Sequence, residues 1–266
     1  MQNRMAARAI WKGVLNIGTS AVPVKLYSAV SEQTVHFRLL HKTDKQPVKQ
    51  ELVSSDSGEV VEFSSVRKAF PLDRGRMVVL DNDELETLEP EESRDIELTR
   101  FVDPHDIDHR WFERAYYLGP DGNTKAYFAV VAALEHKKKS GIARWVMRDR
   151  AYAGALLVEE GYLMLIVLRH ADEIIAADAL TPPGGRALVK REVEMAEQLI
   201  GALHGEFDPS QYRDQYRDRV MELVETKAEG GKPKLKVFRP KKQTEGQLAD
   251  ALEASLAGMK KRKARG

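Results

Sequence analysis

Short runs of β-branched and aromatic residues, broken by Gly and Pro, fill the chain as far as residue 169. Runs of this kind predict strands, and residues 8–30 predict two of them around a turn at 17–19. Pro23 places the start of the second strand at a sheet edge or after a bend. Further strands are expected at 36–40, 59–63, 96–101 and 115–118.

Two shorter signals lie between these strands. A polar segment, SSDSGE, separates the runs at 36–40 and 59–63 and is expected to form an exposed hairpin or loop. A short apolar run at 76–80 is followed by Asp81 and Asp83, either of which can cap a short helix. The sequence GPDG at 119–122 predicts a turn.

The middle of the chain predicts one helix and then a meander. The helix is expected from Asn123 or Thr124 to Lys139, ended by Gly141. Strands should follow at 142–150, 153–159 and 162–169, with a hairpin turn at 159–161. Many short strands with few helices favour a mainly β barrel or sandwich over an alternating βαβ arrangement.

Beyond a breaker at 181–185 the hydrophobic period changes to that of helices. One helix face is predicted to carry Val189, Val193, Ala196, Ile200 and Leu203. A second helix, after the breaker at 207–209 and capped by Asp208 or Ser210, would carry Tyr212, Tyr216, Val220 and Leu223. A last short helix, after a linker rich in Gly, Pro and Lys, would carry Leu248, Leu252, Leu256 and Met259. We therefore expect a β-rich region at 1–184, a helical arm at 185–229, and a linker, short helix and basic tail at 230–266.

Composition removes several function classes. The 266 residues include no Cys, which rules out a disulfide framework, a thiolate nucleophile, an iron–sulfur cluster and Cys-ligated zinc. No apolar run is long enough for a bilayer, and the first thirteen residues are too charged for a secretory signal. We expect a cytoplasmic protein with no membrane partner.

The net charge of +1 conceals a strong segregation of charge along the chain. Residues 227–266 hold twelve Lys or Arg and four acids, a balance of +8, so residues 1–226 carry −7. Residues 81–97 hold nine acids and one Arg, whereas 136–150 hold six bases and one acid. A basic tail on an acidic body is typical of proteins that contact phosphate. The densest part of that tail is Lys260, Lys261, Arg262 and Lys263.

Basic side chains at 137–150 suggest how phosphate would be contacted. If 142–150 is one strand, Arg144, Arg148 and Arg150 share one face with Val146. The spacing from residue i to i+2 on that face, roughly 6.6 Å, resembles the phosphate separation along one DNA strand. Lys137, Lys138 and Lys139 lie beside them in the sequence. A strand with a solvated charged face is the alternative. No recognition helix or zinc finger is evident, so binding would be independent of base sequence.

Candidate catalytic groups are sparse. His105 and His109 are four residues apart and flanked by aspartates, a spacing that could bind a cation from a helix. Pro104 favours a turn instead, and no third ligand is evident. The sequence also lacks a Gly-rich phosphate loop and a connected Ser/His/Asp set. We therefore expect neither a metal nor a cofactor nor catalysis, with a metal-dependent nuclease as the less favoured alternative.

Several short motifs follow one another along the chain in a characteristic order. They are Trp11-Lys12-Gly13 and PVKLY from Pro23, His36-Phe37, and Val78–Leu80 leading into DELETLEP and SRDIEL. They continue with AYYL from Ala115 and its PDG turn, Ile142-Ala143-Arg144, the segment FDPSQYRDQYRDRVMELVETKAEG, and LADALEASL near the end. Together these motifs cover nearly the whole chain and resemble the bacterial Ku family, the homodimeric proteins that bind DNA ends in non-homologous end joining.

The resemblance implies a Ku-type β-barrel core with a bridge insertion and a helical arm. Two copies would form a ring around double-stranded DNA threaded from an end, and the ring would recruit DNA ligase D. The bridge departs from the family pattern at PVKQELVSSDSGE and at RKAFP. Its candidate DNA contacts are Arg38, Lys42, Lys45, Lys49, Arg67 and Lys68.

The resemblance also gives roles to the two apolar stripes. The stripe from Val189 to Leu203 would pack between the two copies, with packing inside one chain as an equal alternative. The stripe from Leu248 to Met259 would dock the ligase. A chromosome-associated protein that binds DNA without end specificity is the main alternative function.

Overall fold

The computed structural model describes residues 8–180 and 189–231. Residues 8–33 and 38–179 form one compact unit, and 34–37, 180 and 189–231 belong to a second.

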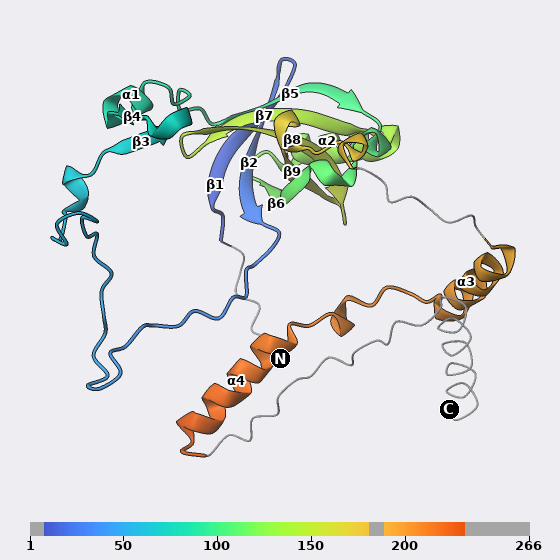
Figure 1. Cartoon of the computed structure of the whole chain (residues 1–266). Helices are drawn as coiled ribbons and strands as arrows, with labels where there is room; N and C mark the ends of the chain where they lie inside the picture. Colours follow the sequence, from blue (N-terminus) through green and yellow to red (C-terminus); the bar gives the residue numbers. More distant parts are fainter. Residues whose placement is uncertain (1–7, 181–188, 232–266) are drawn as a thin grey trace. The chain divides into compact units, whose positions relative to one another are not determined.

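Seven strands of the first unit close into a barrel (Figure 1). Around the barrel their order is β1-β2-β6-β9-β8-β7-β5. Neighbouring strands are antiparallel except β1 and β5, which pair in parallel. The strands are β1 (Trp11–Ile17), β2 (Ser20–Ser28), β5 (Asp95–Val102), β6 (Phe112–Pro120), β7 (Ser140–Met147), β8 (Arg150–Glu159) and β9 (Tyr162–Leu168). The prediction of a mainly β barrel is confirmed.

Alternation along the strands builds the core of the barrel. Leu15, Val24, Leu26 and Leu165 are fully buried, and their neighbours along each strand face outward. Burial of each such side chain contributes about 1.5–3 kcal/mol. Gly154 makes room for an aromatic ring in this core, because a Cβ there would lie 2.6 Å from Cζ3 of Trp145.

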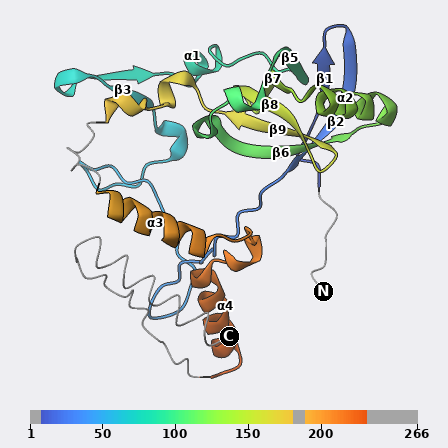
Figure 2. The same cartoon turned by 90° about the vertical axis from the view of Figure 1, so that its right-hand side faces the viewer.

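Helix α2 (Thr124–Lys137) lies against β2 and β8 (Figure 2). The Asn123 side chain caps it by accepting a hydrogen bond from the backbone N–H of Ala126 at 3.1 Å. The predicted stop at Gly141 was wrong, because Gly141 lies within β7. The helix ends at Lys138, whose backbone is left-handed and whose N–H bonds back to Leu134 and Glu135.

Tyr127 fixes α2 to the barrel and is fully buried. Its hydroxyl donates to the carbonyl of Leu118 in β6 at 2.5 Å and accepts from the N–H of Leu163 in β9 at 2.9 Å. Burial raises the pKa of the Tyr127 hydroxyl, so this group stays protonated and able to donate.

Residues 29–94 form an excursion between β2 and β5. It contains a separate hairpin of β3 (Lys68–Pro71) and β4 (Met77–Leu80), then helix α1 (Asn82–Glu86). The Glu84 carboxylate accepts from the N–H of Asp81, which confirms the predicted cap. The strands predicted at 36–40 and 59–63 were wrong, since only the single bridges Leu40–Pro47 and Val53–Val60 form there. The intervening polar segment makes the expected turn, closed from Gly58 to Ser54.

Two predictions about strand boundaries were also wrong. Residues 142–150 are not one strand: β7 ends at Met147, Arg148 and Asp149 form a two-residue loop, and β8 begins at Arg150. Pro23 lies inside β2, opposite Val14, and not at its start. Its ring is tolerated because β6 pairs with β2 only from Val24 onward, so no ladder donor is needed at Pro23.

The described part of the second unit contains helices α3 (Lys190–Leu203) and α4 (Gln215–Ala228). Asp214 caps α4 by accepting from the N–H groups of Tyr216 and Arg217, so this helix begins later than predicted and excludes Tyr212. Asp208 instead caps a 3-10 turn, η7 (Pro209–Gln211).

The first unit also contains short 3-10 turns. They are η1 (Phe63–Ser65), η2 (Asp73–Gly75), η3 (Pro104–Asp106), η4 (His109–Trp111), η5 (Ala171–Glu173) and η6 (Ala177–Ala179). Within the described ranges no helix is long and apolar enough to cross a bilayer.

Candidate nucleic-acid interface

Exposed cations follow the excursion from the end of β2 to the start of β4. Every candidate that the sequence places there is exposed, and Arg67 also forms an ion pair with Asp81, Nε to Oδ1 at 3.4 Å. Sequence reasoning missed two more exposed cations, Arg74 and Arg76, at the turn of the β3–β4 hairpin. The run LDRGR between two apolar runs was the signal for them. The exposed set is Arg38, Lys42, Lys45, Lys49, Arg67, Lys68, Arg74 and Arg76.

Several of the basic residues occupy unusual backbone positions. Lys45, Arg74, Lys138 and Arg148 have positive φ angles between 51° and 63°. Non-glycine residues rarely adopt this left-handed region, because Cβ crowds the backbone there. Asp149 and Glu160 are the other such non-glycine residues in the described ranges. Cations that persist where Gly would be less strained are candidates for a functional role.

The arginines of β7 and β8 do not form the predicted row. Arg144 is exposed on β7 opposite Glu97 of β5, whereas Arg148 is in the β7–β8 loop and Arg150 opens β8. Arg148 instead lines a hollow of about 360 Å³ together with Arg94 and Glu92. The three arginines therefore do not share the face of one continuous strand that was expected to contact phosphate.

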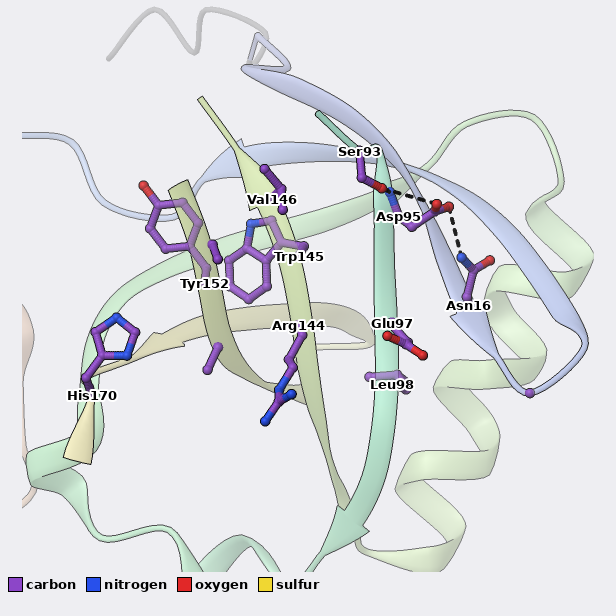
Figure 3. A pocket seen from close by; sticks show the side chains of 13 residues that line it. Asn16, Ser93, Asp95, Glu97, Leu98, Arg144, Trp145, Val146, Tyr152 and His170 are labelled. Atoms are coloured by element: carbon purple, nitrogen blue, oxygen red, sulfur yellow. Dashed lines mark hydrogen bonds between the residues drawn. The ribbon is translucent and has the colours of Figure 1, made fainter. Parts of the chain in front are cut away.

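Arg144 lines a larger groove of about 880 Å³ (Figure 3). Trp145 and Tyr152 stack there with ring centroids 5.3 Å apart, and in this view His170 lies to the lower left of Tyr152. Asp95 accepts a hydrogen bond from the Asn16 side chain at 2.9 Å, which fixes the carboxylate on the opposite side. The groove combines one guanidinium with two acids, Asp95 and Glu97, so it is poorly suited to a phosphate on its own.

The lysine cluster at 137–139 lies at the end of α2. Lys139 Nζ is 2.6 Å from Asp103 Oδ1, so its charge is compensated locally. Lys137 and Lys138 are exposed, and cations at a helix C-terminus are favoured by the helix dipole.

Two further barrel lysines are already engaged. Lys12 and Lys25 contact Asp121 at 3.0 and 2.7 Å. Hydrogen bonds from Lys25 and then Lys12 hold the pKa of Asp121 below its ordinary value, and the same bond raises the pKa of Lys25. We do not count these two lysines as phosphate contacts.

The histidines considered for a metal site fall in separate turns. His105 lies in η3 and His109 in η4, and the His109 side chain is 91% exposed. Arg110 donates a hydrogen bond to the Asp108 carboxylate, and this bond lowers the pKa of Asp108. Over the described residues no group of three or more potential ligands comes together.

The arm stripe of α3 is largely exposed. Val193, Ile200 and Leu203 are exposed, at 70% for Ile200 and 66% for Leu203, whereas Met195 on an adjacent face is buried. Val189 precedes the helix as its cap residue, and Ala196 is half-buried. The proposed ligase stripe (Leu248, Leu252, Leu256, Met259) and the terminal cluster (Lys260, Lys261, Arg262, Lys263) lie outside the described residues.

Comparison with known proteins gives the family. The family model described as "Ku70/Ku80 beta-barrel domain" matches residues 16–197. The chain belongs to the Ku family. A protein of Anaeromyxobacter sp. (strain K) named "Non-homologous end joining protein Ku" is 37% identical over 258 residues, 96% of this chain and 87% of the relative. "Non-homologous end joining protein Ku 2" of Geotalea uraniireducens (strain Rf4) is 34% identical over 255 residues, 95% of this chain and 98% of the relative.

A third relative matches over a shorter range. "Non-homologous end joining protein Ku" of Coxiella burnetii is 34% identical over 233 residues, 86% of this chain and 85% of the relative. The resemblance inferred from the sequence is confirmed, and with it the Ku-type barrel fold. The individual DNA, dimer and ligase contacts remain predictions.

Proposed function

We propose that this chain binds the ends of double-stranded DNA, without reading base sequence, in double-strand break repair by non-homologous end joining. The supporting observation is the exposed set of cations on residues 38–76 in a chain that matches Ku proteins over most of its length. Such cations attract backbone phosphates irrespective of the bases. The chain would act by binding and not by catalysis.

The proposal includes a homodimer. Apolar side chains on the excursion are exposed in one chain, including Phe63 at 85%, and so is the α3 stripe. Monomeric proteins rarely leave this much apolar surface uncovered, and a second copy is the simplest cover. Two copies that encircle a duplex would select ends, since an intact duplex offers no point of entry.

DNA ligase D is the proposed protein partner. This part rests on the family resemblance and on the apolar stripe from Leu248 to Met259, beyond the described residues. The basic cluster from Lys260 would add a tethered DNA contact and raise the effective concentration of the bound end. The division at residues 184 and 229 and the nucleoid-associated cytoplasmic location stay predictions.

The test compares DNA topologies. A linear duplex, a covalently closed circle of the same sequence, and the linear duplex with streptavidin on both ends are titrated with the full chain in a gel-shift assay. We expect binding to the open linear duplex only, because threading requires a free end. Equal binding to the closed circle would reject encirclement and favour a general chromosome-associated protein.

A further inference from the structure

A groove of about 610 Å³ lies between α2 and the β1–β2 hairpin, in the first compact unit. Ala126, Ala129 and Ala133 of α2 form one side, and Ile17 and Val22 of the hairpin also line it. Figure 2 shows α2 beside this hairpin. The groove has the size of sites that bind small molecules or peptide side chains, about 300–1,000 Å³.

The surface of this groove is apolar. Phe101 of β5 lines it and remains 49% exposed, and Val130 and Leu134 add branched side chains from α2. A duplex presents phosphates and sugars on its outside and would leave these groups without apolar partners. A ligand that buries them must itself bring apolar side chains.

The polar side chains at the groove are Ser20 and two lysines. Lys137 lines it from the last turn of α2, and no ion pair of Lys137 forms within the described ranges. Lys139 also lines it, but its ammonium is held by Asp103 at 2.6 Å. The groove therefore presents one uncompensated positive charge beside an apolar surface.

We propose that this groove docks a helical segment of a protein partner, with large apolar side chains on one face and an Asp or Glu opposite Lys137. Alanines at three positions of α2 let the backbone of a docked helix approach closely, and Phe101 offers an aromatic surface for its side chains. The acid satisfies Lys137, and apolar burial supplies most of the affinity. The site is independent of DNA binding and assigns Lys137 to protein recognition.

The test begins with a phage-displayed library of random 16-residue peptides, panned against the full chain loaded with a short duplex. We expect enriched peptides to combine apolar residues at helical spacing with at least one acid. Ala133→Trp fills the groove and should weaken a selected peptide by about tenfold or more. Lys137→Glu should weaken it about three- to tenfold, because it opposes the acid of the peptide.

Matched controls keep the outcome interpretable. Ala132→Trp places the same ring on an exposed α2 position outside the groove, and Lys125→Glu reverses a charge at the other end of α2; both should bind the peptide as wild type. Thermal melts verify that all four variants fold. Duplex-end affinity should not change in Ala133→Trp.

Three results would overturn the proposal. Selected peptides could bind both groove variants as tightly as wild type. Lys137→Glu could weaken DNA binding and spare the peptide, which would return this lysine to the DNA interface. Ala133→Trp could convert a dimer to a monomer in native mass measurements, which would make the groove a contact between two copies.

Discussion

At the scale of single residues, the left-handed cations connect backbone strain with charge. Arg148 and Asp149 have φ angles of 53° and 62° in the two-residue loop between β7 and β8. Loops of this geometry favour Asn-Gly, because both central residues must be left-handed. Arg does not relieve this strain, and Asp relieves it only in part. The loop therefore retains a charged side chain at a cost in stability.

Two single substitutions separate stability from charge. Arg148→Gly should stabilise the fold by about 0.5–1 kcal/mol, because relief of about 1–2 kcal/mol of left-handed strain exceeds the entropic cost of a glycine, about 0.5–1 kcal/mol. Asp149→Gly should stabilise it less, because Asp tolerates the left-handed region better than Arg. Only Arg148→Gly should weaken duplex-end binding and reduce the salt slope, by about one unit for each phosphate that the guanidinium neutralises. Urea unfolding and titrations at several salt concentrations measure the two effects.

Asp149→Gly serves as the control, since it relaxes the same loop and removes no cation. Unchanged DNA binding and salt slope in Arg148→Gly would show that Arg148 does not contact phosphate. A loss of stability in both variants would show that the loop is not strained.

At the scale of elements, sequence patterns predicted what local residues decide. Runs of β-branched and aromatic residues, broken by Gly and Pro, located β1, β2 and the β8–β9 hairpin, and a Gly at 161 marked its turn. The same reasoning placed the β7–β8 loop after Arg150 and not at 148–149, because Arg148-Asp149 carries no Gly, Asn or Pro. The parallel β1–β5 pair that closes the barrel joins residues about 80 positions apart, which no local pattern encodes.

The candidate interface was predicted to a similar extent. The family resemblance pointed to the cations of the excursion, and their exposure is what charged side chains usually show. Sequence reasoning found fewer of their tertiary contacts. It could not show that Lys139 is paired with Asp103 or that Lys137 borders an apolar groove, since both depend on tertiary contacts. Arg144 and Arg148 were predicted to share one strand face, and this was wrong because β7 ends at Met147, before Arg148.

Helix α2 depends on one buried hydroxyl. Tyr127→Phe should destabilise the protein by about 2–3 kcal/mol, because it leaves the Leu118 carbonyl and the Leu163 N–H without their hydroxyl partner in a buried site. Tyr162→Phe is the matched control on β9: Tyr162 is 50% exposed, and its change should stay within about 0.5 kcal/mol. Urea unfolding measures both. Equal midpoints for the two variants would show that the Tyr127 bonds contribute nothing net.

At the scale of the whole molecule, apolar exposure and charge point to the same assembly. The excursion carries exposed cations and exposed apolar side chains together, so the surface proposed to contact phosphate also has apolar groups that a protein would cover. The proposed second copy would meet both needs, because it would cover apolar surface and double the number of cations around one duplex. Because each copy alone would offer an open, weakly basic surface, end selectivity should depend on dimerisation.

The α3 stripe tests this dependence. Ile200→Glu places a charge on a side chain that is 70% exposed in one chain, so the monomer should fold as before, whereas burial of that charge between two copies would be costly. We expect the dimer dissociation constant to rise by about 30-fold or more, equivalent to at least about 2 kcal/mol, with a parallel loss of duplex-end binding. Gln198→Glu adds the same charge at an exposed α3 position outside the stripe and should leave both unchanged. Sedimentation equilibrium measures the dimer dissociation constant, and gel shifts measure duplex-end binding. A stable Ile200→Glu dimer would place the stripe outside the interface. A monomer that binds ends as well as wild type would show that end recognition does not need the ring.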